Sequence, residues 1–162
     1  MREEIIIADS SPLIALARIN QLELLPQFAT RVIIPPTVWH EITIGGKGLV
    51  GAKEVSQITW LEIQAAKPEL VTSLKILIDP GEAEAIALAQ TLSDPMLLLD
   101  DARARRVAER LNIRRIGTVG LLRWAKKVGL INEMRPYLET LQKNGIYIRS
   151  TLIEAVLKDA GE

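Results

Sequence analysis

Short, unbroken apolar runs are the feature of this sequence that most constrains its fold. They lie within residues 4–8 (EIIIA), 31–36 (RVIIPP) and 95–100 (PMLLLD), and a segment with helical character follows each of them. Such runs are typical of strands that are buried on both faces, as in a parallel sheet covered by helices on both sides. The sequence therefore predicts an α/β fold, a three-layer α/β/α sandwich with a central parallel sheet.

Helices are expected between these strands and after them. The clearest covers residues 79–92 (DPGEAEAIALAQTL), with Asp79 as N-cap and Pro80 as first residue. The helix after the first strand has Ser10 or Ser11 as its expected cap. Further helices are predicted within residues 21–28, 37–44, 67–78, 101–111, 118–129, 131–145 and 149–161, with a short edge strand at 58–63 and another strand at 113–117.

Length and composition favour one domain over residues 1–162, with the C-terminal helices at about 131–160 packing on it or forming a dimer interface. Because the sequence has no cysteine, disulfides and thiolate metal sites are excluded, which fits a cytoplasmic location. Asp9 interrupts the N-terminal apolar run, and no later run approaches the roughly 18 residues of a membrane span. A signal peptide and a membrane protein are therefore not expected.

Acidic residues recur close to the ends of the predicted strands. Asp9 follows the first strand, Glu41 lies one short helix after the second, and Asp100 and Asp101 follow the run of leucines. Glu82 lies in the first turn of the next helix, which begins where a crossover would return to the same edge. The carboxyl ends of parallel strands share one edge of a sheet, where ligands bind. Each acid taken alone fits a helix cap or an exposed residue, but their joint pattern predicts a common acidic site.

Clustered carboxylates repel one another unless a cation holds them. Oxygen ligands without cysteine, and with a single histidine in the chain, suit Mg²⁺ or Mn²⁺ better than zinc. Two such ions activate a water molecule and stabilise the leaving oxygen in phosphodiester cleavage. The adjacent pair Asp100 and Asp101 fits this chemistry if one of them caps a helix and the other binds metal. The expected metal ligands are Asp9, Glu82, Asp100 and Asp101.

Glu82 and Glu84 compete for the acidic position at the start of the helix at 79–92. With about 100° of rotation per residue, Ala85, Ile86 and Ala89 share the face of Glu82. Glu82 therefore projects from the buried face, whereas Glu84 lies nearer the polar side. We predict Glu82 as the site residue, with Glu84 as second choice.

Basic residues concentrate next to the paired aspartates. Between Ala102 and Lys127 the only acid is Glu109. The segment is either a solvated helix face or a surface that binds phosphates. Trp124 is expected in the core or an interface, with stacking on a base as the alternative. The residues predicted to bind nucleic acid are Arg103, Arg105, Arg106 and Arg110.

The motifs IIIADSSPLIAL, VIIPPTVWHEI, DPGEAEAIALA, LLLDDARARRVAERL and IGTVGLL together resemble the PIN-domain family. They are most similar to a prokaryotic subgroup described as predicted nucleic-acid-binding proteins containing a PIN domain, over residues 4 to about 125. The resemblance implies an acidic pocket for Mg²⁺ or Mn²⁺ and a single-stranded RNA endonuclease like the VapC toxins. It also implies a homodimer and, for a toxin of a type II toxin–antitoxin pair, an antitoxin partner.

Site residues carry over from the resemblance position by position. The catalytic acids correspond to Asp9, Glu41, Glu82 (or Glu84) and Asp101, with Asp100 adjacent and Ser10 and Thr118 as supporting hydroxyls. Two positions depart from the family pattern: the third acid is Glu rather than Asp, and LLLDD lacks the Thr that precedes the fourth acid in the toxins. These departures leave an alternative open, a nucleic-acid-binding module with little or no turnover.

Overall fold

A central sheet of five parallel strands organises the molecule, in the order β3-β2-β1-β4-β5. The computed structural model describes residues 3–162. The strands are β1 (Ile5–Ala8), β2 (Arg31–Ile34), β3 (Leu61–Ile63), β4 (Met96–Leu98) and β5 (Arg114–Ile116). All pairings are parallel, with Ile7 opposite both Ile33 and Leu97. The edge strand predicted within residues 58–63 is confirmed as β3.

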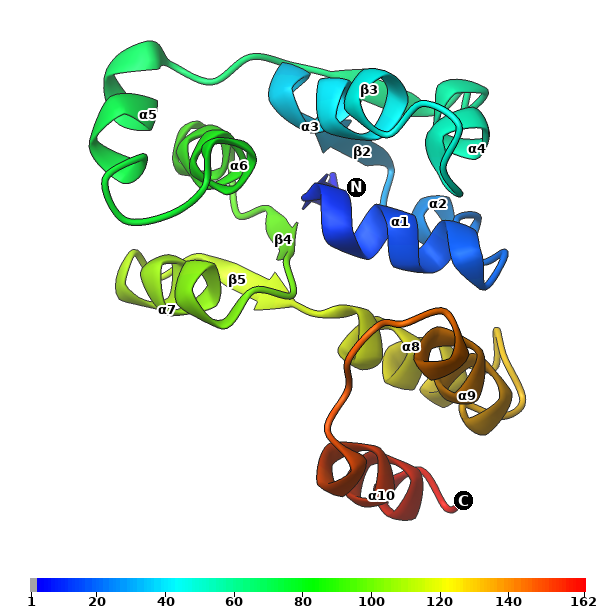
Figure 1. The fold of residues 1–162 in the computed structure, drawn as a ribbon. Coiled ribbons are helices and arrows are strands. Elements are labelled where there is room, and N and C mark those ends of the chain that lie inside the picture. The colour runs from blue at the N-terminus through cyan, green and yellow to red at the C-terminus, as the bar shows by residue number, and fades with distance from the viewer. Residues whose placement is uncertain (1–2) are drawn as a thin grey trace.

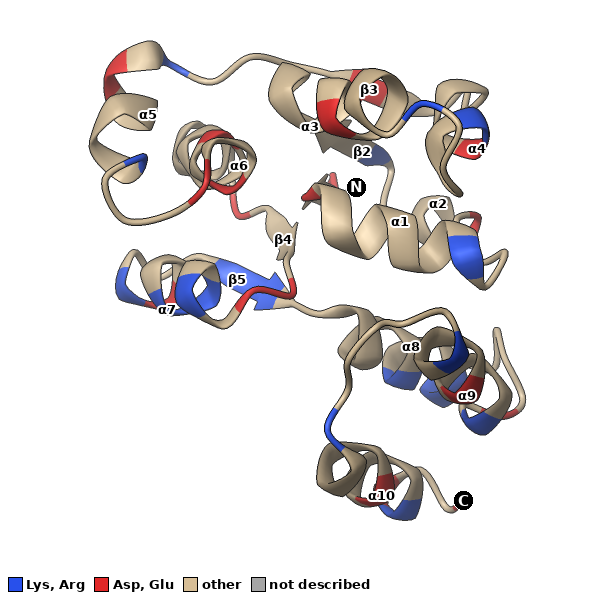
Figure 2. Ribbon diagram, in the orientation of Figure 1, with Lys and Arg blue, Asp and Glu red and all other residues tan. Residues whose placement is uncertain are grey.

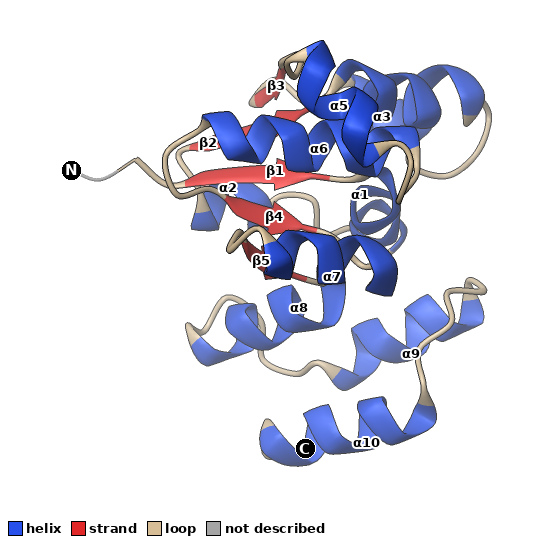
Figure 3. Ribbon diagram, turned by 90° about the vertical axis from the view of Figure 1, so that its left-hand side faces the viewer, coloured by secondary structure: helices blue, strands red, loops and turns tan. Residues whose placement is uncertain are grey.

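Two hydrophobic cores lie on the two faces of the sheet, because alternate side chains of each strand point to opposite sides. Ile5 and Ile7 belong to one core, whereas Ile6 and Ala8 belong to the other. All four residues of β1 are buried, which is why this strand reads as a continuous apolar run. Figures 1 and 3 show the helices on both sides of the sheet. The predicted α/β/α sandwich with a central parallel sheet is confirmed.

Different helices build the two outer layers. The core with Ile5 and Ile7 is covered by α5 (Pro68–Leu74), α6 (Pro80–Thr91) and α7 (Ala102–Arg110). The opposite core is covered by α1 (Ser10–Arg18), α2 (Leu24–Phe28), α3 (Pro36–His40), α8 (Thr118–Lys127) and α9 (Arg135–Lys143). Within this second core Trp124 stacks on Phe28, with ring centroids 3.9 Å apart. Trp124 therefore packs inside the fold, and the alternative of base stacking is not supported.

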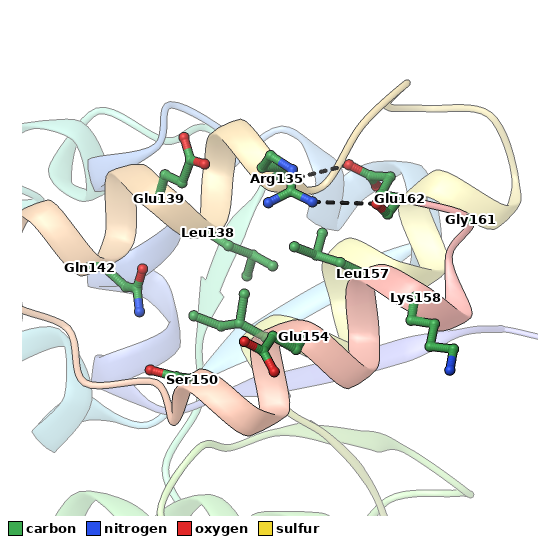
Figure 4. A pocket seen from close by; sticks show the side chains of 11 residues that line it. Arg135, Leu138, Glu139, Gln142, Ser150, Glu154, Leu157, Lys158, Gly161 and Glu162 are labelled. Carbon is green, nitrogen blue, oxygen red and sulfur yellow. Dashed lines mark hydrogen bonds between the residues drawn. The ribbon is translucent and has the colours of Figure 1, made fainter.

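The C-terminal helices α9 and α10 (Ser150–Asp159) lie side by side next to α8 (Figure 3). Leu138 of α9 and Leu157 of α10 face each other and are both buried (Figure 4). The Glu162 carboxylate fixes the end of this unit, because it accepts hydrogen bonds from Lys126 Nζ at 2.8 Å and from the Met134 backbone N–H at 2.8 Å. A dimer interface formed by these helices stays a prediction.

Two local expectations are corrected by the structure. Helix α1 starts at Ser10 with Asp9 in the N-cap position, so neither serine is the cap, and Asp9 makes no side-chain capping bond. The helix expected at residues 37–44 is α-helical only to His40 and continues as a π-helix, η1 (Glu41–Gly45), before α4 (Ala52–Ser56). No helix within residues 3–162 is both long and apolar enough to cross a membrane.

Candidate functional site

The acidic residues gather where the order of the strands switches direction. From β1 the chain passes to β2 and β3 on one side, and it then crosses to β4 and β5 on the other side. The carboxyl ends of β1 and β4 therefore flank the crevice in which open α/β sheets bind ligands. The Asp9 backbone N–H donates to the Leu98 carbonyl at 3.1 Å, which holds the two strand ends together. Figure 2 shows acidic segments after β4 and at the start of α6, close to this edge.

Asp9 and Glu82 are the two buried acids of the described chain, with 5% and 7% of their surface exposed. The pKa of Asp9 is raised to about 6. Burial is the largest cause, a backbone hydrogen bond with Ser10 opposes it, and the charges of the neighbouring acids add to it, namely Glu41, Asp100 and Asp101. The pKa of Glu82 is raised to about 7, mainly by burial and then by the charges of Asp9 and Asp101.

These mutual effects mean that acids from distant parts of the sequence lie close together in the fold. Crowding disfavours their charged forms, as expected for like charges away from water. Two acids with pKa values this near neutrality are also typical of functional sites. The side chains predicted to point to one edge of the sheet do so.

Glu41 reaches the site from the junction between α3 and the π-helix. Ser10 Oγ donates a hydrogen bond to Glu41 Oε2 at 2.9 Å. The carboxylate lies flat against the first turn of α6, where a Cβ on Gly81 would be 3.1 Å from Glu41 Oε1. Gly81 thus leaves the space that Glu41 occupies. π-Helical turns occur frequently at functional sites, and this one begins at Glu41, the acid that follows β2 in the chain.

Asp100 and Asp101 each cap a helix, so the expectation that only one of them does so is wrong. Asp101 Oδ2 accepts from the Ala104 N–H at 2.9 Å and caps α7. Asp100 Oδ1 accepts from the Thr118 N–H at 2.7 Å, and Asp100 Oδ2 accepts from Thr118 Oγ1 at 2.6 Å. Asp100 therefore caps α8 across a sequence separation of 18 residues. Both predicted hydroxyl groups, on Ser10 and Thr118, hold a carboxylate of the site.

Helix N-termini offset part of the negative charge. At the start of three helices a backbone N–H group donates a hydrogen bond to an acid of the site. The acid is Glu82 at α6, Asp101 at α7 and Asp100 at α8. The positive end of a helix dipole stabilises a nearby carboxylate. This contribution favours the carboxylates of Asp100 and Asp101 at their positions next to Asp9.

Glu84 lies apart from this group. It is half-buried, and its Oε2 atom is buried without a hydrogen-bond partner. The charges that raise the Glu82 pKa come from Asp9 and Asp101, so Glu82 is the acid of α6 that lies next to them. The geometry favours Glu82 over Glu84, as the helical pattern predicted.

Gly117 is a residue that the sequence interpretation missed, and it yields a prediction. A Cβ at this position would lie 2.8 Å from Asp100 Oδ1, so a Gly117→Ala variant must turn the carboxylate away from Thr118. Because this breaks the hydrogen bonds that hold α8, we expect a loss of about 1–3 kcal/mol in the free energy of unfolding. Urea denaturation measures it.

The matched control is Gly45→Ala, where the nearest atom to the new Cβ, the His40 carbonyl oxygen, is 3.6 Å away. An ordinary contact of this kind needs no rearrangement. Equal stability of the Gly117→Ala variant and the wild-type protein would show that Asp100 is not held in the way described.

A divalent cation fits the chemistry of the site but finds no preformed cage. Within residues 3–162 no three histidine or carboxylate side chains stand close enough to hold a metal ion as they are. The donor atoms are all hard oxygens, which Mg²⁺ and Mn²⁺ prefer. Glu82 and Asp101 line a hollow of about 340 Å³, with Arg103 and Arg106 on the same wall. A cation there would offset the charges of Glu82 and Asp101, and so oppose the repulsion that adds to burial in raising the pKa of Glu82.

The arginines of the basic segment divide into paired and unpaired groups. Arg114 pairs with Asp94, Arg115 with Glu109, and Arg123 with Asp159. By contrast, Arg103 and Arg106 make no ion pair with any described residue, and both face the hollow with the acids. Arg105 and Arg110, the other two residues predicted to bind nucleic acid, are likewise exposed and without an ion pair to the described chain.

Comparison with known protein families agrees with this geometry. A family model described as a PIN domain matches residues 5–162. The chain belongs to the PIN-domain family. The family predicted from the sequence is thereby confirmed, while the VapC-like subtype remains a proposal. PIN domains are generally nucleases that use divalent metal ions, so the family supports a nuclease-type function that acts on nucleic acid. A search of curated proteins finds no match.

Proposed function

We propose that this PIN-domain protein is a metal-dependent endoribonuclease that cleaves single-stranded RNA. The observation that carries the proposal is the pair of buried acids, Asp9 and Glu82, whose pKa values are raised to about 6 and about 7 by burial and by the neighbouring acids. Such crowding is costly for a structural role and useful for holding a cation. Exposed, unpaired arginines beside the same hollow suit the phosphates of a nucleic acid.

Asp9, Glu82 and Asp101 are the residues that would hold Mg²⁺ or Mn²⁺. The ion, when bound, supplies a Lewis acid that lowers the pKa of water and stabilises charge on the phosphate. Asp101 is suited to this because its capping bond uses only Oδ2. Asp100, predicted as a further metal ligand, already accepts a hydrogen bond on each oxygen, so we propose that it positions α8 and the loop beside Asp101.

Glu41 has a different role in this proposal. Ser10 holds one of its oxygens and Gly81 leaves room for the carboxylate, so its orientation is fixed without burial of the residue. A carboxylate held in this way accepts a proton from the attacking water, which is the role of a general base. Arg103 and Arg106 bind the phosphates that flank the scissile bond, and so hold the strand in the hollow.

The finer identity rests on the resemblance to VapC-like toxins. We propose that the protein acts in the cytoplasm as the toxin of a type II toxin–antitoxin pair, as a homodimer, with an antitoxin chain that covers the acidic site. Four acids and two hydroxyls stand at positions that correspond to the family's site, although the third acid is Glu rather than Asp, and they support this assignment: Asp9, Ser10, Glu41, Glu82, Asp101 and Thr118.

A cleavage assay tests the proposed activity. Purified protein is incubated with end-labelled single-stranded RNA, double-stranded RNA and single-stranded DNA, each in Mg²⁺, in Mn²⁺ and in EDTA. We expect internal cuts in the single-stranded RNA with either metal ion and none in EDTA. Intact RNA in every metal condition would contradict the nuclease proposal, and equal cutting in EDTA would contradict its metal dependence.

A second candidate function is a nucleic-acid-binding module with little or no turnover. It is favoured by the absence, among the described residues, of three acids close enough to form a ready-made metal site. This function requires RNA binding that weakens with salt and survives removal of metal, in a protein that leaves the RNA intact. The same assay, with binding measured in EDTA, separates the two functions.

A further inference from the structure

A pocket of about 680 Å³ adjoins the acidic site on the side opposite Arg103 and Arg106. Its walls are the first turns of α7 and α8 and the segment 146–149 that leads into α10. Asp100 and Thr118 lie at one end, and the polar walls carry Arg105, Tyr147 and Arg149.

We infer that this pocket binds one nucleotide of single-stranded RNA, next to the phosphate that is cut. The inference rests on the proposed function, and it explains how the nuclease site would select single-stranded RNA. Arg105 and Arg149 bind the phosphate of this nucleotide, and Tyr147 stacks on its base.

Charge is the first argument for a nucleotide. Arg105 and Arg149 are exposed and make no ion pair within the described residues. Arg105 Nη1 would be 3.2 Å from a Cβ on Gly117, so the guanidinium lies over the loop that starts α8. Two unpaired guanidinium groups on one pocket supply the positive charge and the hydrogen-bond donors that a phosphate group requires.

The second argument is an exposed aromatic side chain. Tyr147 has 85% of its surface exposed, far more than a tyrosine needs for its hydroxyl to reach water. Ile146 and Ile148, on either side, are half-buried and line the same pocket. An aromatic ring on a partly apolar wall beside cations is the usual platform for a base of single-stranded nucleic acid. Trp124 cannot take this role because it already stacks on Phe28.

Position is the third argument. Ala102, the first residue of α7, lines both this pocket and the hollow that contains Glu82 and Asp101. The two spaces therefore meet at the N-terminus of α7, with Arg105 on one side of the helix and Arg103 and Arg106 on the other. A strand that passes over this helix end has its phosphates bound on both sides of the acids. A base enters such a pocket only when it is unpaired, which explains a preference for single strands.

Binding measurements test the inference separately from catalysis. The probe is a short fluorescein-labelled single-stranded RNA of mixed sequence, and its anisotropy is measured in EDTA with the full-length protein. We expect Tyr147→Ala to weaken binding roughly tenfold, since loss of stacking on one base has this size, and Tyr147→Phe to retain it. Arg149→Gln should reduce the slope of log K against log salt by about 0.7, the value for one phosphate contact on a single strand.

Lys53→Gln serves as the charge control, because Lys53 is exposed on α4 and lines neither space. A second experiment uses an RNA in which one nucleotide lacks its base, next to the position that the wild-type protein cleaves. On this RNA the Tyr147→Ala variant and the wild-type protein should bind equally, because the base that Tyr147 contacts is missing.

The outcomes distinguish the pocket from the catalytic proposal. If the Tyr147→Ala and Arg149→Gln variants bind RNA with normal affinity and salt slope, and the wild-type protein cleaves RNA, the nucleotide pocket is overturned and the nuclease proposal stands. The pocket would then suit a protein segment instead. Weakened binding in both variants of a protein that cuts no RNA would support the pocket and contradict the nuclease. No RNA binding by the wild-type protein would overturn both.

Discussion

An Asp9→Asn variant is expected to cleave RNA at least about a hundredfold more slowly than the wild-type protein. Asp9 stands buried at the end of the central strand, and it is one of the three acids proposed to hold the ion. The amide keeps the size of the side chain and removes the negative charge that a cation requires. Gel analysis of end-labelled RNA in Mg²⁺ or Mn²⁺ measures the rate.

The same substitution should make the metal-free protein more stable at neutral pH, because it removes a buried charge. An inactive variant that unfolds at a lower temperature than the wild type would therefore indicate damage to the fold rather than to the chemistry. Glu133→Gln is the matched control, since Glu133 is exposed and belongs to no part of the site. Cleavage that persists in an Asp9→Asn, Asp101→Asn double variant would rule out the proposed mechanism.

The stability of the metal-free protein should fall as pH rises from about 4 to about 7. In the unfolded chain both acids have ordinary pKa values near 4, whereas burial and neighbouring acids raise the folded pKa of Asp9 to about 6 and of Glu82 to about 7. The folded state therefore binds more protons than the unfolded state within this window, and its stability decreases as they are lost. The expected change is on the order of 3 kcal/mol for each acid, because each pKa is raised by roughly two units and one unit corresponds to about 1.4 kcal/mol.

Urea denaturation in EDTA at several pH values measures this effect. The reference is an Asp9→Asn, Glu82→Gln variant, because subtraction of its profile removes the contribution of all other groups. Above pH 7 the addition of Mg²⁺ or Mn²⁺ should restore stability to the wild-type protein and not to the variant. A difference between the two profiles that does not change with pH would show that the two acids are not crowded in solution.

The strands and most helices were predictable because local sequence determines them. The run IIIA has no polar alternation since both faces of β1 are buried, and α6 carries its own start signal in Asp79 and Pro80. Helical spacing alone also predicted that Glu82 lies on the buried face of α6, which its 7% exposure confirms. The convergence of Asp9 and Asp101 on one edge needed only the rule for parallel sheets.

Features that depend on distant partners were not predictable in the same way. Asp100 caps a helix that begins 18 residues later, and no local pattern shows that contact. The π-helix after His40 has no sequence signal of its own. Whether an arginine is paired depends on partners such as Asp94 and Asp159, which only the fold identifies. The return of Tyr147 and Arg149 to the acidic edge likewise follows from how α9 and α10 pack.

Asp100 and Asp101 each cap a helix as well as belonging to the acidic site, and this determines which residue can be changed to inactivate the protein without destabilising its fold. A change at either position removes an acid and loosens the start of α7 or α8 at once, so loss of activity there has two causes. Asp9 makes no side-chain capping bond. A crystallographer who wants an intact substrate trapped on this protein should therefore begin with an amide at position 9.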